Sequence, residues 1–227
     1  MINSLNFIDG INGLAGGLGA IAFGVFAYLF YMGGLPQLAL LSIAFMGAII
    51  GFLTYNYGKK AAIFMGDNGS TVIGFVMAIF ALKSLNGLSG TAMTSVLPIV
   101  LSLVAIPVLD LFAVVGLRVA KGQSPFVGDR THLHHLLTDS GMSHPEACQF
   151  IFSWLVGSVA IFQFSLITSP VVAFLLITGL YTAVRVKYTS TTTPVVISLA
   201  KLDKPVVQRI PTARLARKWS YLSSFLF

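Results

Sequence analysis

Charged side chains are scarce in this chain of 227 residues. Asp, Glu, Lys and Arg make up 9% of it, whereas soluble domains average about 25%. Hydrophobic residues make up 56%, and the mean hydropathy is +0.88. This composition excludes an ordinary soluble domain and indicates a membrane protein. The single cysteine, Cys148, excludes an internal disulfide. No basic segment precedes a cleavable apolar stretch, so no signal peptide is expected.

Acidic residues are the rarer of the two charge classes, and the excess of positive charge lies at the C-terminus. From Arg185 onward there are eight Lys or Arg residues and one acid, Asp203, a net charge of +7. The preceding residues are neutral overall. Such a tail is typical of a topology signal and of contact with anionic lipid headgroups, and it does not indicate nucleic-acid binding. Apolar residues at helical spacing in 211–227 predict an interfacial helix, with a disordered tail as the alternative.

The apolar residues gather in six stretches of about the length that a membrane-spanning helix needs, roughly 20 residues. These stretches are 13–32, 36–53, 71–88, 93–116, 147–164 and 168–186. Charged connections alternate with short uncharged ones, so the charged connections and both termini fall on one side, which the positive-inside rule predicts to be cytoplasmic. We therefore expect an all-α, polytopic membrane bundle of about six helices at 1–187, followed by a basic cytoplasmic tail at 188–227.

A cluster of acid and amide side chains stands at the start of the chain. Its members, spaced by three, are Asn3, Asn6, Asp9 and Asn12. On a helix this spacing keeps the side chains near one face. Two interpretations remain open: the side chains cap a helix start, or they belong to a functional site at the edge of a span.

A second polar stretch, FMGDNGS at 64–70, precedes the third predicted span. Asp-Asn-Gly is a common turn sequence, and Ser70 would then cap the helix that follows. Alternatively, Asp67 belongs to a metal–phosphate site, where Gly66 and Gly69 let the backbone approach a ligand closely.

Asp110, in the stretch IPVLDLF, is the third candidate because it lies within a predicted span. An acid at such a position is a functional candidate. The alternative is an internal ion pair with a Lys or Arg of a neighbouring helix.

The fourth candidate is the stretch SPFVGDRTHLHHLL at 124–137, in which three histidines lie within four residues. Its polar members are Asp129, Arg130, His132, His134 and His135. The spacing is neither that of a zinc finger nor that of an HExxH helix. Imidazole and guanidinium groups are good partners for phosphate oxygens. His144 stands apart and is expected at the surface.

Acids for a hard cation, basic groups for phosphate and an apolar body beside them favour phosphoryl transfer to a lipid. Catalysis of that reaction consists mostly of positioning and charge neutralisation.

Four stretches resemble, in order, the motifs of the polyprenyl-phosphate N-acetylhexosamine-1-phosphate transferases, glycosyltransferase family 4. They are NSLNFIDGINGLAGG, FMGDNGST, IPVLD and SPFVGDRTHLHHLL. The pattern is similar to the bacterial branch that transfers GlcNAc-1-phosphate from UDP-GlcNAc to undecaprenyl phosphate. The related phospho-MurNAc-pentapeptide translocases typically have three adjacent histidines instead.

The resemblance implies an enzyme of the bacterial inner membrane that performs the first membrane step of envelope polysaccharide synthesis, with UMP as the leaving group. Mg²⁺ is the implied cofactor, with Mn²⁺ as an alternative, and the active site is cytoplasmic. UDP-GlcNAc, undecaprenyl phosphate and membrane lipids are the implied partners.

The resemblance also implies roles for single residues. Asp67 and Asp9 correspond to metal-binding and catalytic acids, and Asp110 to a third acid of the catalytic group. The substrate-binding positions are Asn3, Asn6, Arg130, His132, His134 and His135.

Two departures from the family pattern stand out. The opening motif usually has a second acid where this chain has Asn12, and an amide is neither a general base nor an anionic ligand. The family's N-terminal spans and their adjacent pair of aspartates have no counterpart in the sequence. These departures leave a second hypothesis open: an inactive fragment or a non-enzymatic membrane protein that binds the nucleotide sugar or the lipid.

Overall fold

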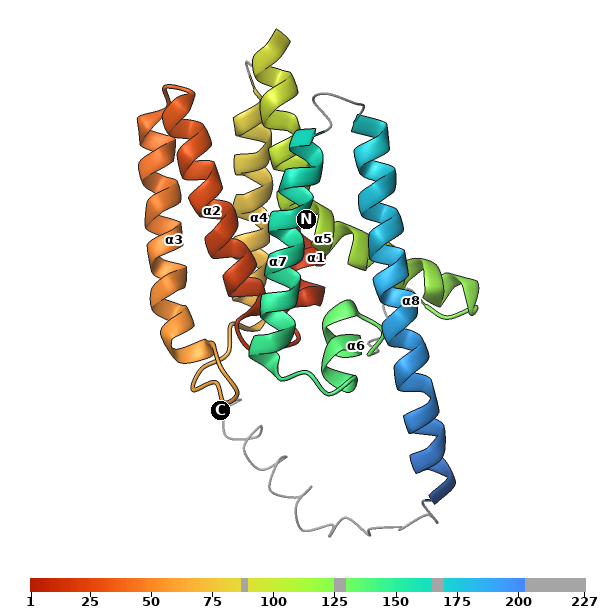
Figure 1. Ribbon diagram of the computed structural model, residues 1–227. Coiled ribbons are helices and arrows are strands. Elements are labelled where there is room, and N and C mark those ends of the chain that lie inside the picture. The colour runs from red at the N-terminus through yellow and green to blue at the C-terminus, as the bar shows by residue number, and fades with distance from the viewer. Residues whose placement is uncertain (87–89, 125–129, 165–169, 203–227) are drawn as a thin grey trace. The chain divides into compact units, whose positions relative to one another are not determined.

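Helices form the whole of the described structure, and no strand occurs in it (Figure 1). The computed structural model describes residues 1–86, 90–124, 130–164 and 170–202. The helices of these ranges are α1 (Ile2–Ile8), α2 (Leu14–Met32), α3 (Pro36–Asn56), α4 (Gly66–Leu85), α5 (Gly90–Ala120), α6 (Leu133–Asp139), α7 (His144–Phe164) and α8 (Pro170–Leu202). The predicted all-α class is confirmed.

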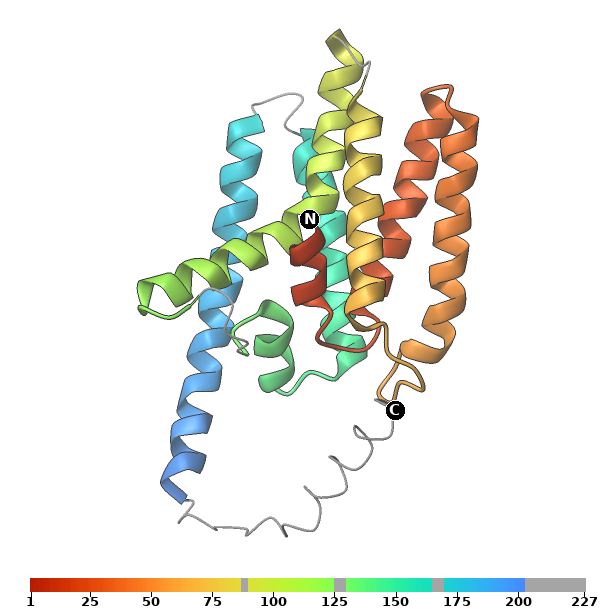
Figure 2. The same cartoon turned by 180° about the vertical axis from the view of Figure 1, so that it is seen from behind.

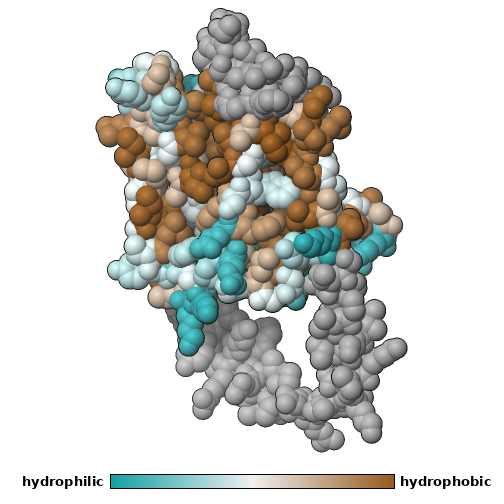
Figure 3. Space-filling model, in the orientation of Figure 1, coloured by the Kyte–Doolittle hydropathy of each residue, from teal (hydrophilic) through white to brown (hydrophobic). Residues whose placement is uncertain are grey.

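Four of the described helices are long and apolar enough to cross a membrane: α2, α3, α4 and the Val96–Ala120 part of α5. Large apolar side chains point away from the helices, such as Leu40 at 69% and Leu82 at 71% exposure. Figure 3 shows apolar surface over the helical body and the most hydrophilic residues near its lower edge. The chain is therefore a membrane protein.

The fifth and sixth predicted spans, 147–164 and 168–186, fall on α7 and α8. The number of six spans stays a prediction, since the four helices identified as long and apolar enough in the described residues do not include α7 and α8. Met1–Thr192 form one compact unit and Thr193–Phe227 a second. All contacts described below belong to the first unit. The division into domains stays a prediction, and the predicted interfacial helix at 211–227 lies outside the described residues.

The aromatic core lies between α2, α3 and α4. The ring of Phe80 on α4 meets Phe23, Phe26 and Phe30 of α2 edge to face, at centroid distances of 5.7, 6.0 and 5.4 Å. This geometry suits the quadrupoles of aromatic rings. The core thus fixes α4, and with it Asp67, against the helix that follows the opening cluster.

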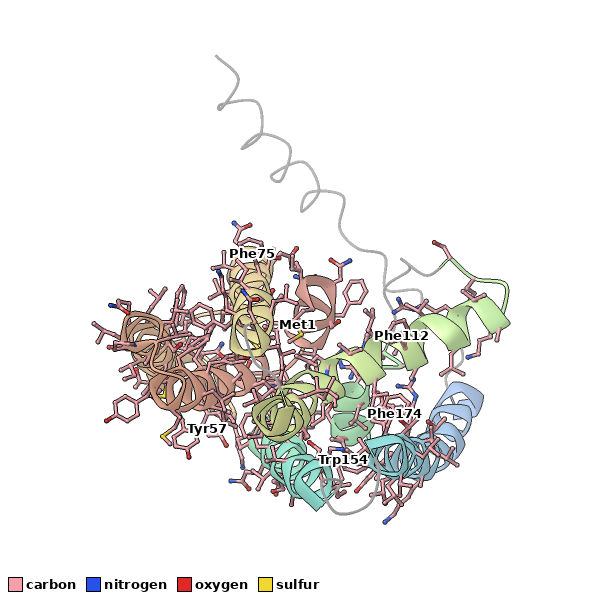
Figure 4. All side chains as sticks on the ribbon, turned by 90° about the horizontal axis from the view of Figure 1, so that it is seen from above. Met1, Tyr57, Phe75, Phe112, Trp154 and Phe174 are labelled. Atoms are coloured by element: carbon pink, nitrogen blue, oxygen red, sulfur yellow. The ribbon has the colours of Figure 1, made fainter. Side chains whose placement is uncertain are left out.

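Helix α5 changes direction within its length, which is visible from both sides (Figures 1 and 2). Pro98 and Pro107 lie inside it. Proline lacks the N–H of an intrahelical hydrogen bond and its ring pushes against the preceding turn, so it kinks a helix. Asp110 therefore lies just after a proline, on the part of α5 that carries the exposed Phe112 (Figure 4).

The short helix α1 packs against α4 and α5. At the closest approach to α4, a Cβ atom on Gly74 would lie 3.0 Å from the Cα atom of Ile2. Figure 4 shows Met1 of this segment beside α4, whose Phe75 points outwards. A small residue at position 74 lets the opening cluster sit directly on the helix that carries Asp67.

Replacing Gly74 with Val should lower the melting temperature of the detergent-solubilised protein. The added side chain meets the backbone of α1, which cannot yield as a flexible side chain does, and overpacking of this kind costs about 1–3 kcal/mol. The matched control is Gly51→Val on α3, where an added Cβ meets nothing within 4 Å. Equal melting temperatures for the two variants would contradict the close approach of α1 and α4.

Candidate functional site

Asp67 lies in the first turn of α4, which begins at Gly66, five residues before the predicted span. The expected cap at Ser70 is wrong: the N-cap is Met65, without a side-chain cap, and Ser70 lies inside the helix. Its hydroxyl donates to the carbonyls of Gly66 and Asp67, both at 3.2 Å. Asp-Asn-Gly thus forms helix rather than a turn, and the N-terminal turn of a helix favours a carboxylate.

The opening cluster and α4 are joined by the amide of Asn6. Its Nδ2 atom donates to Asp67 Oδ1 at 3.2 Å and to Ser70 Oγ at 3.0 Å. Asn6 was predicted as a substrate-binding residue. That role stays a prediction; in the structure its amide nitrogen orients the Asp67 carboxylate. Asn3, from the same cluster, is exposed.

A cavity of about 210 Å³ is lined both by the acid of the opening cluster and by the acid of the 64–70 stretch. Its lining residues are Asp9, Gly10, Ile11, Asn12, Asn56, Phe64, Met65, Gly66 and Asp67. Asp9 and Asp67, separated by more than fifty residues in sequence, are its two carboxylates. The predicted pairing of these acids in one site therefore agrees with the geometry.

The Asp9 carboxyl group has a pKa of about 6 instead of 3.8, mainly because it is partly buried and further because Asp67 carries a like charge nearby. Its ionised form is therefore destabilised in the folded protein. A cation in this cavity would relieve the repulsion, since an opposite charge favours the carboxylate form.

The capping interpretation of the opening cluster is wrong. Helix α2 starts after Gly13, whose φ of 84° is left-handed, and no side chain caps it. Helix α1 also lacks a side-chain cap. Asn12 bonds across the fold instead: its Nδ2 atom donates to the Gly58 carbonyl at 3.1 Å.

Asp110 is buried, with 1% of its surface exposed, and it accepts four hydrogen bonds. His132 Nδ1 lies 2.7 Å from Oδ2, while the Leu133 N–H at 2.9 Å, Tyr181 Oη at 2.7 Å and Arg185 Nη1 at 3.3 Å meet Oδ1. Of the two interpretations, the structure shows the internal ion pair, with Arg185 of α8 as the cation. Arg185 Nη2 also donates to the Thr131 carbonyl at 2.6 Å. Asp110 thereby joins α5, α8 and the start of α6; its catalytic role stays a prediction.

The histidines near α6 occupy three different environments. His132 is bound by Asp110, and His135 is half-buried. His134 is fully buried, and neither of its ring nitrogens has a hydrogen-bond partner. Burial, and next the neighbouring His135, lower the pKa of His134 to about 3, so the ring is neutral. Its Nε2 edge lies against Gly10 and leaves no room there for a Cβ atom.

Gly10 therefore connects the histidine segment, residues 130–137, to the cavity of Asp9 and Asp67.

Arg130 forms an ion pair with Asp139, at 2.5 Å between Nη2 and Oδ1, and its side chain is 66% exposed. Asp129 lies outside the described residues.

Three residues of this region were missed by sequence analysis or placed wrongly. Asn56 accepts a hydrogen bond from the Gly13 N–H at 2.8 Å and donates one to the Ile63 carbonyl at 2.8 Å. His144, expected at the surface, is half-buried and its Nδ1 accepts the Asn12 N–H at 3.3 Å. Arg185 was counted only as part of the basic tail. For Asn56, the available signal in the sequence was a polar residue shortly after an apolar stretch.

The donor set of the cavity suits a magnesium ion. Mg²⁺ in proteins keeps several waters and is held by one or two carboxylates together with substrate phosphates. Asp9 and Asp67 supply two carboxylates in one polar cavity. No cluster of three or more His, Cys, Asp or Glu side chains suited to a metal occurs in the described part of the chain. The remaining ligands would come from water and phosphate.

Comparison with known proteins confirms the family resemblance. Residues 1–85 match the family model Glycosyl transferase family 4. The undecaprenyl-phosphate alpha-N-acetylglucosaminyl 1-phosphate transferase of Yersinia pestis is 40% identical over 149 residues, which are 64% of this chain and 40% of that protein. The protein of the same name from Escherichia coli K12 is 35% identical over 150 residues, again 64% and 40%.

A mycobacterial relative carries a different lipid in its name. The decaprenyl-phosphate N-acetylglucosaminephosphotransferase of Mycobacterium leprae is 35% identical over 181 residues, 70% of this chain and 44% of that protein. The chain thus spans about two fifths of the length of these relatives. No solved structure matches it.

Replacing Asp67 with Asn should lower the pKa of Asp9 below 6. The substitution removes the like charge, and the contribution from burial remains. Carboxyl-stretch infrared spectroscopy of protein labelled with ¹³C-Asp, titrated from pH 3 to pH 8, measures this shift after subtraction of the matching spectra in which Asp9 is replaced by Asn. In the wild type, ionisation of Asp9 costs stability as the pH rises from about 4 through 6, and this loss should come at lower pH in the variant. An unchanged Asp9 titration would contradict the coupling of the two acids.

Replacing Asp110 with Asn should destabilise the protein strongly, by about 3–5 kcal/mol, because Arg185 would remain buried without its counter-charge. The control is Asp139→Asn, which breaks the exposed pair with Arg130 and should cost less than about 1 kcal/mol. Melting temperatures of the two purified variants test the difference. Similar losses in both would show that the buried network is not what holds α8 and the histidine segment.

Proposed function

We propose that the protein containing this chain transfers GlcNAc-1-phosphate from UDP-GlcNAc to undecaprenyl phosphate and releases UMP. The observation that carries the proposal is the cavity in which Asp9 and Asp67, from two separate family motifs, lie together at one end of apolar helices. The names of the relatives support a polyprenyl phosphate and a sugar phosphate as substrates. UDP as the carrier and the pathway step are inferred from the resemblance.

In the proposed reaction, a phosphate oxygen of undecaprenyl phosphate forms a bond to the β-phosphorus of UDP-GlcNAc. The bond between that phosphorus and the bridging oxygen breaks, and UMP leaves with the electron pair. A Mg²⁺ ion, or Mn²⁺ in its place, held by Asp9 and Asp67 would neutralise the pyrophosphate charge. Positioning and charge neutralisation are the main demands of phosphoryl transfer.

Asp9 suits an alternative role in the same cavity, in which Asp67 alone holds the metal ion and Asp9 is not a ligand. With a pKa of about 6, its carboxylate predominates at neutral pH and binds a proton more readily than an ordinary aspartate. This is the range in which a general base works best. We assign Asp9 to accept the remaining proton of the lipid phosphate. Asn6 keeps Asp67 oriented through the hydrogen bond that its side-chain amide donates.

The basic groups near α6 divide between binding and positioning. Arg130 is exposed and His135 half-buried, so these two can reach the donor's phosphates. His132 is fixed by Asp110, and His134 lies against Gly10. We assign His132 and His134 to holding the segment in place beside the cavity. Direct contact of His134 with the donor would require α6 to move.

The position of the lipid substrate in the proposal follows from the apolar composition of the helices. Apolar helices beside the cavity let the polyprenyl chain stay in the bilayer while its phosphate reaches the acids. The charge pattern of the connections favours a cytoplasmic cavity at the bacterial inner membrane, where nucleotide sugars are available.

A binding protein without catalysis is the second candidate, favoured by the amide at position 12. It would bind UDP-GlcNAc without releasing UMP. The two candidates differ in turnover, and a single assay can therefore separate them.

The assay incubates membranes that contain the protein with labelled UDP-GlcNAc, undecaprenyl phosphate and Mg²⁺, and it measures the labelled lipid and UMP. Both products should form in equal amounts and vanish with a chelator. Asp67→Asn should lower the rate by at least about 100-fold, while Glu146→Gln, an acid-to-amide change at an exposed site bonded to Ser143, should leave it unchanged. Binding without either product would support the second candidate, and full activity of Asp67→Asn would refute the metal role.

A further inference from the structure

Asn12 connects three segments that are distant in sequence. Its Nδ2 atom donates to the Gly58 carbonyl at 3.1 Å, in the segment 57–65 between α3 and α4. Its main-chain N–H donates to His144 Nδ1 at 3.3 Å, and its carbonyl accepts the Cys148 thiol at 3.4 Å, both on α7. One residue thus ties the end of the opening cluster to two other parts of the fold.

The neighbouring contact strengthens the same connection. The Gly13 N–H donates to Asn56 Oδ1, and Asn56 Nδ2 donates to the Ile63 carbonyl, both at 2.8 Å. Asn12 therefore holds the segment 57–65 near its start, and Asn56 holds it near its end. Phe64, Met65 and Asp67 follow directly and line the cavity.

We infer that Asn12 is a positioning residue whose amide N–H holds the segment 57–65 over the cavity, so that position 12 works in this chain as a hydrogen-bond donor and not as an acid. The Gly58 carbonyl can only accept a hydrogen bond, and a carboxylate has no hydrogen to donate. The family-type acid at this position would therefore break the contact. This structural role of Asn12 does not depend on the proposed reaction. Any effect of Asn12 on turnover does rest on the proposed function.

Electrostatics point the same way. Asn12 shares the cavity with Asp9 and Asp67. A carboxylate at position 12 would be a third negative charge there and would also face the negative end of the Gly58 carbonyl dipole. The titratable residues in contact with Asn12 are His144 and Cys148 of α7, and Lys59 and Lys60 follow Gly58 in the 57–65 segment. The lysines are exposed, so water screens their attraction.

Lys59 and Lys60 make the contact measurable, because trypsin cleaves after them. Cleavage of a folded protein follows the population in which the segment has opened. The experiment treats the full chain in detergent with trypsin at pH 8 and follows the fragments ending at residues 59 and 60 by mass spectrometry. Asn12→Ala should be cleaved there about fivefold faster than the wild type, and Asn12→Asp about tenfold or more, since loss of the bond opens the segment.

Asn86→Asp is the matched control. It makes the same amide-to-acid change at the exposed C-terminal end of α4, where the hydrogen bond of residue 86 within the described part of the chain is that of its main-chain N–H to the Lys83 carbonyl. Its cleavage rate after Lys59 and Lys60 should equal that of the wild type.

A pH profile separates positioning by a donor from simple loss of packing. A carboxyl group that is protonated can donate to the Gly58 carbonyl, so folding should raise its pKa, and its stabilisation should be present at low pH and lost as the pH rises. Asn12→Asp should therefore melt below Asn12→Ala at pH 8 and above it at pH 5. The two variants differ only at position 12, so a reversal of their melting order reports the carboxyl group introduced there.

Two results would overturn the inference: wild-type cleavage rates for both Asn12 variants, or no reversal of their melting order between pH 8 and pH 5. Higher transfer activity in Asn12→Asp than in the wild type would also overturn it, because position 12 would then act as an acid. If Asn12→Asp does not fold, the rate for Asn12→Ala still decides. The cleavage assay contains no substrate, so failure of the proposed transfer leaves its outcome unaffected.

Discussion

A polar group that enters the apolar interior of a membrane protein must find its hydrogen-bond partner there, and this constraint organises the described structure. Asp110 of α5 has its hydrogen-bond partners on the histidine segment and on α8. Near the cavity, amides meet the same constraint: Asn6, Asn12 and Asn56 each bond to a segment distant in sequence. The exceptions among the described residues are the two ring nitrogens of His134 and the hydroxyls of Ser4 and Thr178, which are buried without partners.

Periodicity and composition predicted the helices well because a span is a local property of the sequence. Four predicted spans fall on helices with the required length and hydropathy. The start of α4 was placed too late, since Asp-Asn-Gly favours turns in isolation. In the protein, the amide of Asn6 holds Asp67 in the first turn of α4, a contact that no local pattern reveals.

The acids of the site were predicted by resemblance, and their meeting in one cavity agrees with it. The residues that hold them were not predictable, because each contact joins residues far apart in the chain. Asn56 lies beyond the predicted span 36–53 and was not singled out, and Arg185 was counted with the basic tail. Whether Asp110 paired internally was undecided until its distance to Arg185 was known.

The separations of these contacts also set an order for assembly during synthesis. Asn6 meets Asp67 and Asn12 meets Gly58, so this half of the cavity can close once Asp67 has left the ribosome. The contacts of Asn12 with His144 and Cys148, and of Asp110 with Arg185, must wait until those later residues have followed. Because domains form as their segments emerge, the acid cavity would be an early structure onto which the histidine segment and α8 dock late.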